Sequence, residues 1–309
     1  RPRTRGQSPA WEAFDGPDTA YPDAWIADEA VSTLRKLTDA NEPWFLAVGF
    51  FKPHLPFAAP KSWFDRHDSA EIPVLRSTVA ARPDWPSGWH GSGEFRGNYG
   101  HEDLDPDTHP AYARQLRHAY AACVTYVDAQ AGRVLDILRE LGEAENTIVI
   151  IWSDHGFLLG EHAIWGKHCL YEDALRAPLM IRVPGQRNAG AISDAVVESV
   201  DIFPTLADLC GLPMPSGLDG QSLSPQLDDP GAPATKPALG FWTGGRRTIR
   251  NADWRLIVRE RDEGVLDSIE LFNYRTDPGE TRNQAAEHPE VVQDLLDKLA
   301  TAPIPSRQR

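Results

Sequence analysis

The stretch TIVIIWSDHGFLLGEHAIWGKHCLYED, residues 147–173, decides the fold of this 309-residue chain. Residues 147–152 are apolar or β-branched, which is typical of a strand buried on both faces. Asp154 and His155 follow this run, and Lys167 comes shortly after them. Ligands of open α/β sheets gather beyond the carboxyl ends of the strands. An acid, an imidazole and an amine at such a place therefore indicate a candidate active site.

Helix-like and strand-like segments alternate on both sides of this stretch. We expect helices over residues 23–40, 112–141, 200–209 and 289–300, and strands over residues 44–51, 147–152 and 179–183. This alternation predicts an α/β fold in which helices cover a mostly parallel sheet.

The sequence changes character near residue 230, where Pro and Gly become dense. Short strand-like runs then follow over residues 239–243, 247–250, 254–260 and 269–274, and residues 251–253 can turn the middle pair into a hairpin. We therefore predict two domains. Residues 1–230 form the α/β part, and residues 231–309 form a small antiparallel-sheet subdomain with a closing helix.

Composition narrows the class of protein. The net charge of −14 argues against a nucleic-acid partner, because an acidic surface repels phosphate backbones. No apolar run approaches the roughly 18 residues of a membrane span. The three cysteines are widely spaced, which disfavours a disulfide framework or a structural zinc site.

The chain opens with RPRTRG rather than Met, and we interpret this start as the inside of an open reading frame.

Asp154 and His155 are the candidate metal ligands. A carboxylate binds hard divalent cations, and an imidazole nitrogen can complete the pair. The alternative is structural, because an Asp-His pair after a strand also suits a turn followed by a helix N-cap.

Lys167 and His54 are the candidate catalytic and substrate-binding residues. Lys167 offers a fixed positive charge to an anionic substrate, and His54, which follows the strand predicted over residues 44–51, can donate a proton to a leaving alkoxide. Each also has a plain alternative, since a lysine is often only solvated and a histidine between prolines can brace a turn. For Glu161, His162 and His168 we expect surface or supporting roles.

Residues 58–110 form a long segment without periodicity, and such segments are often functional. Its aromatic and basic residues are candidates for substrate specificity, unless the segment simply packs against the fold: Trp85, Trp89, His90, Arg96 and Tyr99.

Four segments together resemble the sulfatase family of the alkaline-phosphatase-like superfamily, and most of all its iduronate-2-sulfatase-like members. They are residues 44–65, 126–168, 199–223 and 270–285, the last being ELFNYRTDPGETRNQA. The resemblance implies an alkaline-phosphatase-like α/β domain followed by the family's small C-terminal subdomain.

The resemblance also implies roles for the candidate residues. Asp154 and His155 match two ligands of a divalent cation, usually Ca²⁺, although the softer imidazole leaves Mn²⁺ open. Lys167 matches a lysine that contacts the sulfate, and His54 matches a histidine that contacts the sulfate and assists the leaving group. The implied substrate is a small-molecule or carbohydrate sulfate ester. Family habit favours a periplasmic or secreted location.

The sequence departs from the family pattern at the nucleophile. Sulfatases attack with a formylglycine made in a C/S-x-P-S/A-R motif, and no such motif occurs among the 309 residues. The Asp-Asp pair that supplies further metal ligands is also missing before residue 44. We therefore expect a C-terminal fragment, inactive alone, whose formylglycine lies in an absent N-terminal part. Two alternatives stay open: a phosphodiesterase or phosphonate monoester hydrolase of the same superfamily, and a non-catalytic remnant that binds anionic ligands.

Overall fold

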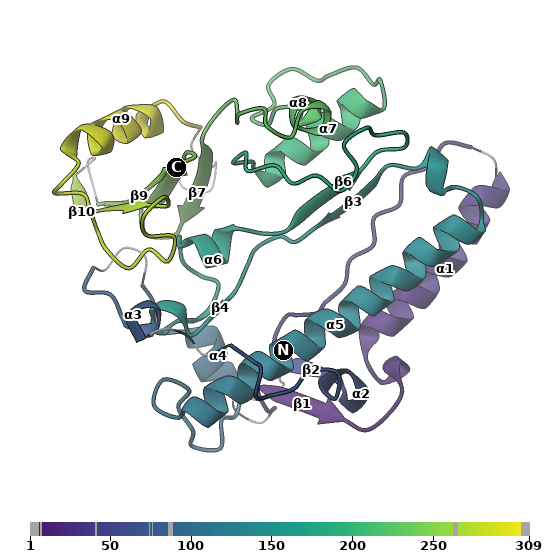
Figure 1. The fold of residues 1–309 in the computed structure, drawn as a ribbon, viewed down its shortest axis with the longest axis horizontal. Coiled ribbons are helices and arrows are strands. Elements are labelled where there is room, and N and C mark those ends of the chain that lie inside the picture. Colours follow the sequence, from purple (N-terminus) through teal and green to yellow (C-terminus); the bar gives the residue numbers. More distant parts are fainter. Residues whose placement is uncertain are drawn as a thin grey trace. The chain divides into compact units, whose positions relative to one another are not determined.

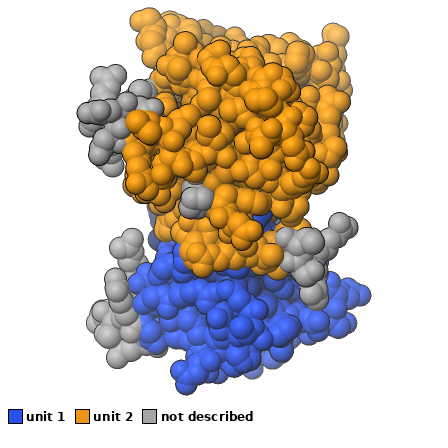
Figure 2. All heavy atoms as spheres, turned by 90° about the vertical axis from the view of Figure 1, so that its left-hand side faces the viewer, with its two compact units in different colours: residues 1–76, 91–148, 159–166 blue, residues 77–90, 149–158, 167–309 orange. Residues whose placement is uncertain are grey.

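The computed structural model describes residues 6, 8–40, 42–73, 75, 77–85, 89–261 and 265–303. The opening residues 1–5 lie outside this part of the chain. The chain divides into two compact units, coloured in Figure 2. Unit 1 comprises residues 1–76, 91–148 and 159–166, and unit 2 comprises residues 77–90, 149–158 and 167–309.

Unit 1 is built on two long helices and a pair of parallel strands. Its elements are β1 (Trp11–Phe14), η1 (Asp18–Ala20), α1 (Pro22–Ala40), β2 (Phe57–Pro60), α2 (Lys61–Phe64), α4 (Gly93–Asn98), α5 (Pro110–Glu140), η2 (Ala144–Asn146), η3 (Glu161–Ala163) and β5 (Trp165–Gly166), which pairs with the short β4 (Leu158–Leu159). α1 lies along α5 (Figure 1), and β1 pairs with β2 in parallel. The helices predicted over residues 23–40 and 112–141 are confirmed.

α5 holds the start of α1 through buried polar contacts. The Tyr126 hydroxyl accepts a hydrogen bond from the Ala24 amide at 3.1 Å and donates one to the Asp18 carbonyl at 3.0 Å. Gln130 donates to the Asp18 carboxylate at 2.9 Å. α5 is 31 residues long, but none of the described helices is both long enough and apolar enough to cross a membrane.

Residues 44–51 form no assigned strand and pair with no strand among the described residues. Phe45 is 78% exposed and Phe51 is 65% exposed, so the prediction of a strand buried on both faces is wrong here. The end of this segment is fixed by Asp23, whose buried carboxylate accepts hydrogen bonds from the amides of Phe51 at 2.7 Å and Lys52 at 3.0 Å. Asp23 thereby fixes the start of the loop that carries His54.

Unit 2 contains a short two-stranded sheet and a larger four-stranded one. Its elements are α3 (Ser77–Ala80), β3 (Val149–Trp152), α6 (Glu172–Leu175), β6 (Leu179–Arg182), η4 (Ser199–Asp201), α7 (Ile202–Leu209), α8 (Ser224–Asp228), β7 (Ala238–Trp242), β8 (Arg246–Arg250), β9 (Trp254–Glu260), β10 (Leu266–Asn273) and α9 (Pro289–Ala300). The predicted strands and helices within residues 147–300 are all present. β9 and α9 have the predicted bounds, and the ends of the others are shifted.

β3 and β6 pair antiparallel, with Ile150 opposite Ile181. This antiparallel pair is an exception to the mostly parallel sheet that the sequence predicts. A parallel pair needs a crossover connection, usually a helix of several turns. The connection from β3 to β6 instead contains only short elements such as the four-residue α6, and β6 returns in the opposite direction.

The four-stranded sheet is antiparallel throughout, in the order β10-β9-β8-β7. α9 covers one of its faces (Figure 1), and the apolar core between them consists of Ile249, Leu256, Val258, Leu271, Val292, Leu295 and Leu299. Because side chains alternate along a strand, the opposite face carries the polar residues Thr248, Arg250 and Arg255. The hairpin predicted at residues 251–253 is confirmed, since the Asn251 side chain accepts hydrogen bonds from the amides of Asp253 and Trp254.

We expect Asp23→Ala to lower the free energy of unfolding by about 2 to 3 kcal/mol, because two backbone N–H groups lose their acceptor. Urea unfolding measures this change. Asp39→Ala, at the exposed end of the same helix, is the control and should change the free energy by less than about 0.5 kcal/mol. Equal effects of the two substitutions would contradict the role given to Asp23.

Candidate active site

His54 lies in unit 1, in a loop fixed from several sides. Its amide donates to the Phe51 carbonyl at 3.0 Å, and the Lys52 ammonium donates to the Pro56 carbonyl at 2.7 Å. The peptide bonds Lys52–Pro53 and Leu55–Pro56 are cis. Burial lowers the pKa of Lys52, whose ammonium braces this loop. The loop therefore has a backbone shape set before any ligand binds.

The His54 ring is oriented by a carbonyl. Nδ1 lies 2.8 Å from the Leu55 oxygen, and because a carbonyl can only accept, Nδ1 carries the hydrogen. Nε2 is then the nitrogen that can exchange a proton with a ligand. It lies 3.5 Å from the Glu94 carboxylate, which the sequence reasoning did not single out. Glu94 belongs to α4, forty residues away, and nothing in its local sequence signals this contact.

Asp154 and His155 follow β3 in unit 2, as predicted from the sequence. The Asp154 side chain is 81% exposed, and its carboxylate lies 3.6 Å from His155 Nε2. His155 Nδ1 lies 2.8 Å from the Gly156 carbonyl, so Nδ1 carries the hydrogen and Nε2 keeps a lone pair when the ring is neutral. One accessible carboxylate and one imidazole nitrogen are thus adjacent.

This donor pair fits a divalent cation as two of its ligands. Among the described residues, no group of three or more His, Cys, Asp or Glu side chains is arranged to hold a metal ion. Ca²⁺ takes about six to eight oxygen ligands, so Asp154 and His155 supply only part of such a shell.

Gly156 fixes the position of the pair. Its amide donates to the Ala174 carbonyl of α6 at 2.8 Å, and a Cβ at this position would lie 2.1 Å from the Asp173 carbonyl oxygen. Only glycine fits such an approach. The Asp-His-Gly sequence is therefore bound directly to α6.

Lys167 is partly buried and begins the segment that leads into α6. His168, its neighbour, stacks on Trp242 of β7 with ring centroids 5.1 Å apart. His90 lies 6.1 Å from His168, and burial, His168 and Arg246 lower the pKa of His90 to about 4. The residue after Lys167 therefore belongs to a cluster of histidine, arginine and aromatic side chains within unit 2, which we call the His168–Trp242 cluster.

The other residues considered for substrate specificity either pack within the fold or belong to the His168–Trp242 cluster. Tyr99 is buried, Arg96 pairs with Asp105 and Asp107, and Trp85 donates to the Tyr171 hydroxyl at 3.0 Å. The packing alternative therefore accounts for these three. Trp89 lies under the Arg82 guanidinium, at 3.6 Å from its ring centroid, and His90 belongs to the cluster.

Glu161 and His162 take local structural roles in unit 1. The Glu161 carboxylate accepts a hydrogen bond from the Leu159 amide at 2.6 Å, and His162 is buried with a positive φ of 53°.

The cysteines offer no activated thiol at these sites. Burial raises the pKa of Cys123 and of Cys169 to about 12, so both remain protonated near neutral pH. Cys169 is thus excluded as a nucleophile although it lies two residues after Lys167.

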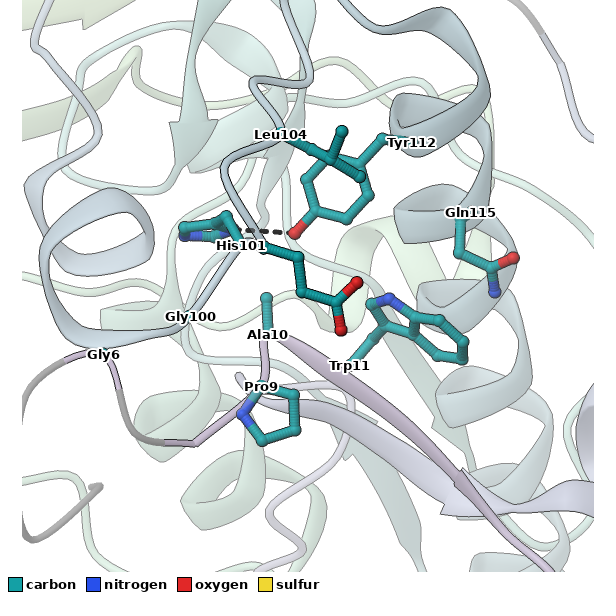
Figure 3. Close-up of a pocket in the computed structure, with 10 residues that line it drawn as sticks. Gly6, Pro9, Ala10, Trp11, Gly100, His101, Leu104, Tyr112 and Gln115 are labelled. Carbon is teal, nitrogen blue, oxygen red and sulfur yellow. Dashed lines mark hydrogen bonds between the residues drawn. The ribbon is translucent and has the colours of Figure 1, made fainter.

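Unit 1 also contains a cavity of about 580 Å³ that the sequence did not indicate. Figure 3 shows His101 and Tyr112 at its wall, with the Tyr112 hydroxyl 2.7 Å from His101 Nδ1. Trp11, Glu102 and Gln115 also line it, and none of the candidate catalytic or metal-binding residues does.

Comparison with known proteins defines the class. A solved phosphonate monoester hydrolase from Silicibacter pomeroyi superposes with a TM-score of 0.73 at 27% identity, over 91% of this chain and 59% of that one. The fold is the alkaline-phosphatase-like α/β fold that sulfatases and phosphonate hydrolases share.

Two family models match, one described as sulfatase over residues 3–212 and one as N-sulphoglucosamine sulphohydrolase, C-terminal, over residues 160–303. The chain belongs to the sulfatase family. It is 31% identical to a sulfatase from Formosa agariphila, over 89% of this chain and 52% of that protein. It is 34% identical to iduronate 2-sulfatase from Mus musculus, over 66% of this chain and 42% of that protein. The chain thus spans about half the length of these curated relatives.

We expect the shifted pKa of His90 to make the protein less stable in acid. The ordinary pKa is 6.5 and the folded value is about 4, so between these values unfolded His90 binds a proton that folded His90 excludes. Stability is therefore lost as the pH falls from 6.5 toward 4, by about 1 to 2 kcal/mol at pH 5.

The measurement is urea unfolding of the wild type and of His90→Gln at pH 7 and pH 5. The variant should lose less stability than the wild type between the two pH values. An identical acid loss in both proteins would show that His90 does not titrate in this way.

Proposed function

We propose that this chain forms part of the active site of a sulfuric ester hydrolase that cleaves sulfate monoesters. Asp154 and His155 bind the divalent cation, Lys167 contacts the sulfate, and His54 contacts the sulfate and assists the leaving group. The observation that carries the proposal is the sulfatase family match over residues 3–212, which includes all four residues. The nucleophile in this family is a formylglycine, and no C/S-x-P-S/A-R motif that would form one occurs in these 309 residues.

The positive charges of the proposed cation and of Lys167 suit this reaction. A sulfate monoester is an anion, and its S–O bond breaks as negative charge builds on the departing oxygen. The cation, Ca²⁺ or Mn²⁺, would act as a Lewis acid that polarises the sulfuryl group. The Lys167 ammonium would stabilise the sulfuryl oxygens by its fixed charge, and this stabilisation grows where water is excluded.

His54 is suited to the proton transfer. Its Nδ1–H donates to the Leu55 carbonyl, so Nε2 is the nitrogen that would carry the transferred proton. The formylglycine would supply the oxygen that bonds to sulfur. As the bond from sulfur to the leaving oxygen breaks, His54 Nε2 would give its proton to that leaving oxygen. The Glu94 carboxylate lies 3.5 Å from this nitrogen.

The proposed substrates are sulfated sugars. The relative from Mus musculus is named for iduronate, and the His168–Trp242 cluster, which includes the residue after Lys167, combines an aromatic face with basic groups. Aromatic rings stack on apolar faces of ligands, and the fixed charges of Lys167 and of Arg246, which lies near His90, attract a sulfate. This local positive charge offsets the repulsion of an anion by a chain with a net charge of −14.

Phosphonate monoester hydrolysis is the second candidate function, favoured by the superposition on the enzyme from Silicibacter pomeroyi. We expect the full-length enzyme to hydrolyse nitrophenyl sulfate with a higher kcat/KM than a nitrophenyl phosphonate ester in side-by-side assays. A preference for the phosphonate would replace the sulfatase assignment by the second candidate.

We expect Asp154→Ala in the full-length protein to weaken binding of Ca²⁺ and Mn²⁺ by more than the roughly 10- to 100-fold caused by outer-shell substitutions, because an anionic ligand is lost. Calorimetric titration measures the affinities. Asp194→Ala, an exposed acid in the same unit, is the control and should bind both metals as the wild type does. Unchanged affinity in Asp154→Ala would remove this residue from the metal site.

A further inference from the structure

Unit 2 contains a buried cluster of charges that neither the proposed metal site nor the proposed sulfate contact uses. Arg255 Nε donates to the Tyr274 hydroxyl at 2.9 Å and lies 3.1 Å from the Glu280 carboxylate. Tyr274 donates to that same carboxylate, and Arg255 Nη2 donates to the Glu172 carboxylate. The side chains of Arg255 and Glu280 are each only 3% exposed. We call this set the Arg255 cluster.

Arg250 completes the charge balance. Its guanidinium lies 3.7 Å from the Tyr274 ring centroid, and its Nε lies 3.7 Å from the Glu172 carboxylate. Two arginines thus face two glutamates. Buried charges are costly unless they are paired in this way, and removing one partner leaves the other unpaired. Burial raises the pKa of Glu280 to about 7, and Arg255 opposes this rise, so Glu280 is mostly ionised at pH 8.

The Arg255 cluster holds the first residue of α6 at two points. The Glu172 carboxylate binds Arg255, and the Glu172 amide donates to the Glu280 carboxylate at 2.8 Å. Glu280 is part of the closing segment of residues 270–285, which carries the resemblance to the family but contributes no residue to the proposed chemistry. Both the main chain and the side chain of Glu172 are therefore bound to the four-stranded sheet and its following loop.

α6 in turn connects to both candidate segments of unit 2. Gly156 donates to Ala174 with no space for a Cβ, which fixes Asp154 and His155 immediately before it. On the other side, the buried residues 169–171 link α6 to Lys167. A movement of α6 would consequently move the metal ligands and the lysine together.

We propose that Arg255, Glu172 and Glu280 are positioning residues, which set the location of Lys167 and of the Asp154–His155 pair by clamping α6. This inference rests on the proposed function only in taking those residues as the active site. Its alternative is that the Arg255 cluster merely stabilises unit 2.

The test compares two substitutions that act on opposite faces of the same sheet. Arg255→Met removes the clamp, while Leu295→Ala opens the apolar core under α9 without touching the Arg255 cluster. Both are made in the full-length protein and studied at pH 8, well below their melting temperatures. The rate of hydrogen exchange in peptides within residues 153–175 measures how firmly α6 is held, and this measurement does not require activity. The kcat/KM for nitrophenyl sulfate measures the effect on catalysis.

We expect Arg255→Met to speed exchange in residues 153–175 at least about tenfold and to lower kcat/KM by roughly 10- to 100-fold, since a displacement of about 1 Å can cost 100-fold. Leu295→Ala should lower the melting temperature but leave both readings within about twofold of the wild type. Equal changes in both variants would overturn the positioning role and leave only a stabilising one.

Glu172→Gln provides a milder test if Arg255→Met does not fold. It keeps the amide hydrogen bond to Glu280 and loses the charge attraction to Arg255, so exchange in residues 153–175 should again rise while the rest of unit 2 is unchanged. Unchanged exchange would refute the inference. If the wild type cleaves no sulfate ester, the proposed function fails, and the exchange data alone decide whether the Arg255 cluster holds this segment.

Discussion

The amide of Gly156 donates to the Ala174 carbonyl at 2.8 Å, and the candidate metal ligands depend on this approach. A backbone contact without room for a Cβ leaves little freedom to the residues just before it. Asp154 can therefore stay 81% exposed and hydrated without being loosely placed. Asp154 is held in place through α6, which is only four residues long and is not stable as an isolated helix. The buried charged residues on the four-stranded sheet and its following loop bind the first residue of α6 and so stabilise this short helix.

Two lysines illustrate how burial separates structural from chemical roles. Lys52 and Lys167 both follow apolar runs, and the sequence alone does not rank them. Burial lowers the pKa of Lys52, and its ammonium donates to the Pro56 carbonyl within the loop of His54. Lys167 instead immediately precedes His168, which stacks on Trp242, so a ligand there would meet both charge and an aromatic face. The structure thus assigns the Lys52 ammonium to its own loop, and Lys167 stays the proposed sulfate contact.

The sequence predicted the positions of helices and strands better than it predicted which strands pair and which distant side chains are in contact. The helical periodicity of α5 and the turn at Asn251 depend on local contacts, and both were found where expected. Residues 44–51 have the composition of a buried strand, yet pairing depends on neighbouring strands, which no local pattern specifies. The candidate metal ligands were predicted correctly to follow a strand, because this depends only on local sequence. Glu94 and Arg255 were missed because their contacts join residues that are 40 and 83 positions apart, and nothing near them in the sequence marks a partner.

The exposed carboxylate of Asp154 has a consequence for how a sulfatase of this kind would bind its cation. One carboxylate and one imidazole fill only two positions of a divalent-cation shell. The resemblance to the family assigns further positions to an Asp-Asp pair, which does not occur before residue 44, so Asp154 and His155 do not set the affinity of the site alone. Under the proposed function, oxygens of the sulfate could occupy a position that the protein ligands leave open. Metal and substrate would then each raise the affinity for the other, since the binding free energies of two ligands at one site are reciprocally coupled.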